Sequence, residues 1–96
     1  MENNDIYVRK LSKPISYEEN EYTELTFDFG SLSGNDMLKV DRDMKEFAPI
    51  PAFSLEFSAR LAARAAKVDF DVMELLSVSD FNAVTQAARN FINRKA

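Results

Sequence analysis

The segment Tyr22-Thr23-Glu24-Leu25-Thr26-Phe27-Asp28-Phe29 carries the clearest structural signal in this chain. Its apolar side chains, Leu25, Phe27 and Phe29, alternate with polar neighbours. This is the period of a β-strand that buries one face and leaves the other in water. We therefore expect a strand here, with its apolar face packed on a core.

A second strand is predicted upstream of this segment. Residues 6–11 alternate in the same way, and Pro14 is typical of an edge strand because it donates no hydrogen bond to a ladder. A polar, turn-like stretch follows at residues 17–21 and leads into the first segment. Residues 6–29 are therefore predicted to form a β-hairpin.

Downstream of the hairpin the apolar spacing becomes helical. The predicted helices run from Asp36 to the prolines at 49 and 51, from 54 to about 67, within 69–76, and from the N-cap Ser77 to about 93. Together these elements predict an α+β fold, an N-terminal β-hairpin packed against a bundle of three to four short helices.

The domain organisation follows from the length and from this element order. We expect a flexible N-terminus at residues 1–5 and a single domain over residues 6–96. Within that domain the hairpin occupies residues 6–29 and the helical part residues 35–93.

Several classes of chemistry are excluded by residues that the chain lacks. Its 96 residues include no His and no Cys, which excludes Cys/His zinc sites, disulfides, cysteine nucleophiles and histidine general bases. The acidic pairs at 18–19 and 41–43 match no metal motif, and the link between Gly30 and Gly34 lacks the Lys of a phosphate-binding loop. We expect no catalytic residue, no metal site, no cofactor and no small-molecule substrate, and hence a protein that is not an enzyme.

The charge pattern argues against nucleic acid and membrane partners. The net charge is −4, and the first fifty residues carry six basic against eleven acidic side chains. Basic residues cluster only at Arg89, Arg94 and Lys95, too few for a duplex-binding surface. No signal peptide and no apolar run of membrane-spanning length is present, so we expect a cytoplasmic protein.

Residues 55–68 carry two apolar stripes at helical spacing. One consists of Leu55, Ala59, Ala62 and Ala66, and the other of Phe57, Leu61, Ala65 and Val68. A helix that is apolar on two faces is either central in the core or partly presented to a partner. The central position is the favoured alternative.

The order of the motifs resembles a known family. The matching segments are Lys13-Pro14-Ile15, Glu21-Tyr22-Thr23-Glu24-Leu25-Thr26-Phe27, an early Asp36, Leu61-Ala62-Ala63-Arg64-Ala65-Ala66, Leu76-Ser77-Val78-Ser79-Asp80-Phe81 and a closing Phe91. Over roughly residues 6–92 the chain is similar to the small tail assembly chaperones of long contractile- or flexible-tailed bacteriophages, including the type found in phage Mu.

The resemblance implies a role in phage or prophage tail assembly. Such chaperones bind the long tape measure protein, keep its hydrophobic helices soluble, and yield to tail tube subunits as these polymerise around it. They are not enzymes and are not expected in the mature virion, so the implied location is the cytoplasm of the bacterial host. Self-association is left open, as is a longer, frameshifted form.

A chaperone of this kind needs a modest apolar patch surrounded by charge. The candidate partner-binding residues are Phe57 and Leu61, on the second stripe, with Phe47 and Phe53 beside the proline link. The main alternative function is a small, non-catalytic interaction adaptor or regulator with a bacterial partner. A DNA-binding regulator is the third.

Overall fold

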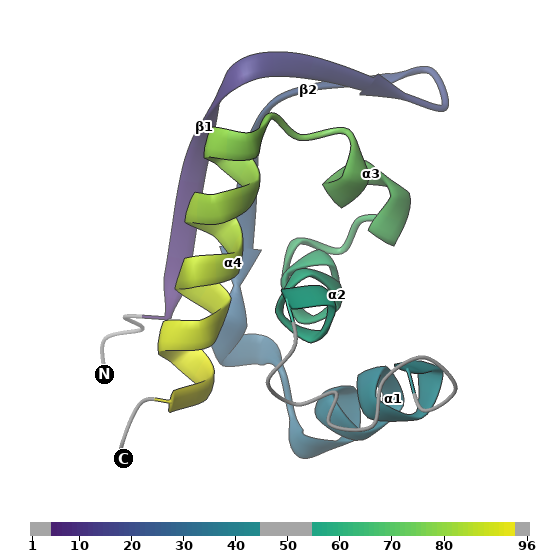
Figure 1. The fold of residues 1–96 in the computed structure, drawn as a ribbon, viewed down its shortest axis with the longest axis vertical. Helices are drawn as coiled ribbons and strands as arrows, with labels where there is room; N and C mark the ends of the chain where they lie inside the picture. The colour runs from purple at the N-terminus through teal and green to yellow at the C-terminus, as the bar shows by residue number, and fades with distance from the viewer. Residues whose placement is uncertain (1–4, 45–54, 94–96) are drawn as a thin grey trace.

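The computed structural model describes residues 5–44 and 55–93. The elements in chain order are β1 (Ile6–Tyr17), β2 (Asn20–Asp28), the single 3-10 turn η1 (Phe29–Ser31), α1 (Gly34–Met44), α2 (Leu55–Ala66), α3 (Phe70–Glu74) and α4 (Val78–Asn93). The two strands form a long, bent antiparallel hairpin, and the helices lie on its concave side (Figure 1). This arrangement confirms the predicted α+β fold.

The bend of the hairpin coincides with a break in its register. The ladder runs from Ile6 opposite Asp28 to Tyr17 opposite Asn20, but residues 11–14 of β1 face only Thr23 of β2. Extra residues on one strand form a bulge, which bends the strand and increases its local twist. The bulge directs the second half of the hairpin over α3 (Figure 1).

The hairpin closes through a two-residue turn with an unusual composition. Glu18 and Glu19 both adopt positive φ, at 49° and 70°. This turn geometry is normally occupied by Asn-Gly or Asp-Gly, because a side chain with a Cβ is strained in the left-handed region. The tip of the hairpin is therefore a locally unfavourable, doubly acidic segment.

The apolar face of the hairpin builds the larger of two hydrophobic clusters, here named the main core. Its buried members are Leu11, Ile15, Leu25, Phe27, Phe29, Ala62, Ala63, Ala65, Val72, Met73, Leu76, Val84 and Ala88. They come from both strands, η1, α2, α3, α4 and the segment between α3 and α4. The alternation predicted for residues 24–29 is confirmed, because the three apolar side chains of that segment are buried.

The second core is a smaller cluster between α1 and α2. It consists of Val40, Met44, Phe57 and Leu61. Helix α2 therefore contributes to both cores, which confirms the central position favoured for a helix with two apolar stripes. Its alanines Ala62, Ala63 and Ala65 belong to the main core, while its larger side chains Phe57 and Leu61 pack against Val40 and Met44 of α1.

Ser77 caps α4 as predicted. Its hydroxyl oxygen accepts a hydrogen bond from the backbone N–H of Asp80 at 3.2 Å, which satisfies one of the amides that a helix start leaves unpaired. In a capping box the acidic side chain at the third helical position turns back to the cap residue. The carboxylate of Asp80 instead reaches β1.

Candidate functional site

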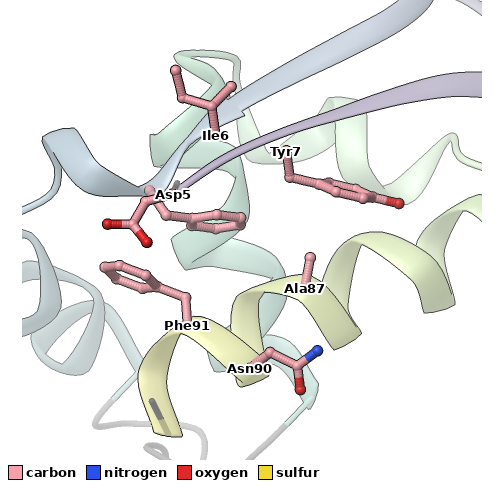
Figure 2. Close-up of a pocket in the computed structure, with 7 residues that line it drawn as sticks. Asp5, Ile6, Tyr7, Ala87, Asn90 and Phe91 are labelled. Atoms are coloured by element: carbon pink, nitrogen blue, oxygen red, sulfur yellow. The ribbon is translucent and has the colours of Figure 1, made fainter. Parts of the chain in front are cut away.

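An open pocket lies between the first residues of β1, η1 and the last turns of α4. Its volume is about 250 Å³, and it is lined by Asp5, Ile6, Tyr7, Phe29, Ala87, Asn90 and Phe91. In Figure 2, the start of β1 forms one wall and α4 the opposite wall. This pocket, the β1–α4 pocket, joins residues from the two ends of the chain.

The aromatic wall of the β1–α4 pocket is formed by two stacked rings. The ring centroids of Phe29 and Phe91 lie 5.4 Å apart with an interplanar angle of 22°, within the range of favourable offset stacking. Ala87 precedes Phe91 by one helical turn, so both side chains lie on the same face of α4. The small side chain of Ala87 leaves open the space beside the Phe91 ring.

Two hydrogen bonds fix the polar groups of the pocket. The backbone N–H of Phe29 donates to the backbone oxygen of Asp5 at 2.9 Å, which extends the hairpin ladder to the pocket mouth. On α4 the side-chain amide of Gln86 donates to the Asn90 Oδ1 at 3.1 Å. The pocket thus combines an apolar aromatic wall with a polar rim, the usual composition of a site that binds part of another molecule.

The main buried polar cluster lies at the opposite end of α4. The Asp80 side chain is fully buried and accepts hydrogen bonds from Arg9 Nε at 3.0 Å and from the backbone N–H of Ser12 at 2.9 Å. The Ser12 hydroxyl also donates to the Asp80 Oδ2, at 3.1 Å, and lies 3.0 Å from the hydroxyl of Ser77. Burial alone raises the pKa of Asp80, but the hydrogen bonds from Ser12, Arg9 and Ser77 outweigh it and lower that pKa below its ordinary value.

The Asp80 cluster is a structural tie. Ser12 lies in the bulge and has no register partner on β2, and Asp80 accepts the hydrogen bond of its backbone N–H. Among the described residues, the hydrogen bonds that reach the carboxylate from another element come from Arg9 and Ser12 of β1. We therefore assign this cluster to holding the hairpin against α4.

A smaller pocket between α1 and α2 is lined by two arginines that are engaged elsewhere. Arg60 pairs with Glu56 at 2.7 Å and lies 4.3 Å from the centroid of the Phe70 ring. Arg64 pairs with Asp36 at 2.7 Å. These pairings place a carboxylate beside each guanidinium group.

Tyr17 connects the hairpin tip to the start of α3. Its hydroxyl lies 3.2 Å from a carboxylate oxygen of Asp69 and 3.2 Å from one of Asp71, and donates to them. Burial, followed by the hydrogen bond and the negative charges of its neighbours, raises the pKa of Tyr17 well above its ordinary value. In the part of the chain that the structure describes, no group of three or more acidic side chains is placed to hold a metal ion.

Two of the residues proposed to bind a partner are buried in this structure. Phe57 is 1% exposed and Leu61 is 0% exposed, because both fill the second core between α1 and α2. Neither side chain is available on the surface of this conformation. Phe47 and Phe53 lie outside the described residues.

The β1–α4 pocket was not predicted from the sequence. Phe29 was assigned only to the buried face of its strand, and Phe91 only to the apolar stripe of the last helix. The signal that was present is the small residue Ala87 one turn before Phe91. This alanine forms part of a pocket only because the start of β1 lies opposite it, and that contact depends on the tertiary structure.

The search against protein-family models, the search of curated proteins and the search of solved structures each find no match for this chain. Among the described residues, no helix combines the length and the apolar character needed to cross a membrane.

Proposed function

We propose that this protein is a tail assembly chaperone of a bacteriophage or prophage, which binds the tape measure protein in the host cytoplasm and keeps it soluble while the tail tube assembles. Two lines support this proposal, the motif resemblance over residues 6–92 and the presence of an open, aromatic-walled pocket on a strongly charged protein. The pocket is the observation that carries it. The chaperone acts by binding alone, with no catalytic step and no cofactor.

The pocket suits the reversible binding of an apolar side chain from a client helix. A Leu or Phe side chain entering between β1 and α4 contacts the stacked rings of Phe29 and Phe91 and is thereby removed from water. A single pocket of about 250 Å³ buries one or two side chains. The affinity is therefore modest, so tail tube subunits can displace the chaperone. The net charge of −4 favours solubility of the complex.

The test is to sequence the DNA beside this gene for a tape measure gene and to co-purify the product of that gene with this protein. Ala87→Glu places a carboxylate inside the pocket, and we expect it to reduce capture of the client by about tenfold or more, since a buried apolar contact is replaced by an unpaired charge. Ala83→Glu is the matched control. Ala83 lies one turn earlier on α4 and is likewise partly exposed, but it is not a pocket residue.

Two results would contradict the proposal. If the unaltered protein does not retain the tape measure protein, the chaperone function is wrong and the adaptor alternative takes its place. If Ala87→Glu and Ala83→Glu bind equally well, the client contacts another surface. Circular dichroism of both variants separates loss of binding from loss of fold.

A further inference from the structure

The outer edge of β1 presents backbone groups that β2 does not use. The backbone N–H of Phe29 donates to the Asp5 oxygen at 2.9 Å, so Asp5 directs its backbone carbonyl toward the hairpin partner. Backbone direction alternates along an antiparallel strand. The N–H and C=O groups of Ile6 and Val8 therefore point away from β2, and in the described residues the sheet contains no further strand.

The side chains on this part of β1 resemble those of an inner strand. Ile6 is 48% exposed and Val8 is 53% exposed on the convex face of the hairpin. Their cross-strand neighbours on β2, Asp28 and Thr26, are polar. Polar outward side chains are typical of an edge strand, whereas exposed β-branched residues beside an open edge are the pattern expected where another strand is added.

The sequence of this edge is complementary to itself. Asp5-Ile6-Tyr7-Val8-Arg9 reads acidic, β-branched, aromatic, β-branched, basic. In an antiparallel pairing of two copies about Tyr7, Asp5 of each copy lies opposite Arg9 of the other, and each Ile6 lies opposite a Val8. Cross-strand pairs of opposite charge and of β-branched residues are both stabilising. Arg9 contacts Asp80 through Nε, and its guanidinium has further N–H donors.

Other parts of the hairpin are unsuited to such pairing. The exposed side chains of β2 include Glu21 and Glu24, so two copies of that edge repel. Beyond Lys10 the bulge interrupts β1, and Lys13 and Pro14 follow, residues that natural edge strands use to prevent pairing. The self-complementary part is therefore limited to residues 5–9.

We propose that residues 5–9 of β1 pair with the same residues of a second copy, giving a symmetric dimer with a four-stranded antiparallel sheet in the order β2-β1-β1-β2. A two-fold axis perpendicular to the sheet relates the two copies, so the interface is isologous. The same axis places both sets of helices on one side of the sheet. The two β1–α4 pockets then lie on the same face, one on each side of the axis. This proposal does not depend on the chaperone function.

The first test is the mass of the unaltered protein in solution. A pairing this short buries less than a standard interface, so we expect micromolar affinity and measure light-scattering masses from about 10 µM to about 1 mM. The expected result is a shift from the 10.9 kDa of one chain toward twice that mass. Masses that stay at 10.9 kDa over the whole range would overturn the proposal.

The second test removes the apolar pairing without disturbing the core. Val8→Lys acts twice in a symmetric dimer, because it replaces by a charged side chain each Val8 that lies opposite Ile6 of the other copy, so we expect the dimer to weaken by about tenfold or more. Leu38→Lys is the matched control, because Leu38 is an aliphatic residue of α1 that is 59% exposed. A dimer that Val8→Lys leaves unchanged contradicts pairing through this edge.

The third test reads the register through cysteines, which the native chain lacks. Opposite residues in a hydrogen-bonded pair have Cα atoms about 5.5 Å apart, a distance that a disulfide spans. The double variant Ile6→Cys/Val8→Cys is expected to form an interchain disulfide on oxidation. Each single variant is expected to remain uncrosslinked, since its Cys lies opposite Val8 or Ile6. Crosslinking of a single variant, or none of the double variant, rejects the proposed register.

Discussion

The main core and the second core differ in how many elements they join. The main core takes buried residues from both strands, η1, α2, α3 and α4, so no element that contributes to it leaves without disrupting others. Among residues 5–44 and 55–93, the second core has four buried residues, which come from α1 and α2, and Leu32, Met37 and Ile92 pack against them. Its principal polar support is the ion pair between Arg64 and Asp36, at 2.7 Å on the surface.

This difference predicts two levels of stability in one small domain. Elements with few buried contacts open locally at a lower free energy than the elements that share the largest core. Helix α1 is therefore the first element expected to detach, and the hairpin with α2 and α4 the last. The effects expected below decrease from a large loss of stability in the main core to a small gain at the hairpin tip.

Phe27→Ala is expected to give the largest loss, about 3–5 kcal/mol of global stability, because Phe27 is fully buried at the centre of the main core. Met44→Ala, in the second core, is its counterpart. We expect Met44→Ala to accelerate amide hydrogen exchange in α1 before that of β2. Equal acceleration in both elements would show that the two cores unfold as one unit.

Asp80→Ala is expected to cost about 2–4 kcal/mol in urea unfolding, because it leaves the Ser12 N–H and the Arg9 guanidinium without their buried acceptor. Asp80→Asn keeps the shape and one acceptor oxygen, so its cost is expected to be smaller. Because Asp80 joins β1 to α4, we expect amide hydrogen exchange to accelerate in both of these elements together. A loss below about 0.5 kcal/mol contradicts the structural role.

Acid is expected to destabilise the domain by protonating two carboxylates that are paired in the folded state, those of Asp36 and Asp80. Hydrogen bonds from the backbone N–H of Ser33 and from Arg64 lower the pKa of Asp36, and the contacts described above lower that of Asp80. A depressed folded-state pKa contributes stability that is present above the unfolded-state value, about 4, and is lost as the pH falls through the folded value.

We therefore expect the free energy of unfolding to decrease below about pH 5. Asp36→Asn should make the decrease in the free energy of unfolding between pH 7 and pH 3 smaller by about 1 kcal/mol or less, since the ion pair with Arg64 lies at the surface. Urea unfolding between pH 7 and pH 3 measures the slope. An unchanged slope in both Asp36→Asn and Asp80→Asn would show that other acids control it.

The smallest effect is a gain, at the hairpin tip, away from both cores. Glu18→Asn with Glu19→Gly is expected to stabilise the domain by about 0.5–1 kcal/mol, because Asn-Gly adopts positive φ with little strain. The urea midpoint measures this gain. A double variant that is less stable than the unaltered protein would indicate that the two glutamates make contacts outweighing the strain.

The sequence predicted the secondary structure better than the surface. Alternation from Leu25 to Phe29, two apolar stripes on α2 and a Ser77 cap are local signals, and each is confirmed. Phe57 was proposed as a partner-binding residue yet is buried, because periodicity shows that a stripe is apolar but does not show which element covers it. Likewise, the β1–α4 pocket requires the start of β1 to lie beside the last turns of α4, and no local signal specifies this contact.

The tie between Ser12 and Asp80 also constrains when the molecule is able to form. Their contact spans 68 positions of the chain, and that between Arg9 and Asp80 spans 71. During synthesis the hairpin is made before α4, so the Ser12 N–H reaches its Asp80 acceptor only after α4 is made. The first strand is thus made early and docked late, because its tie to α4 forms only once Asp80 has been synthesised.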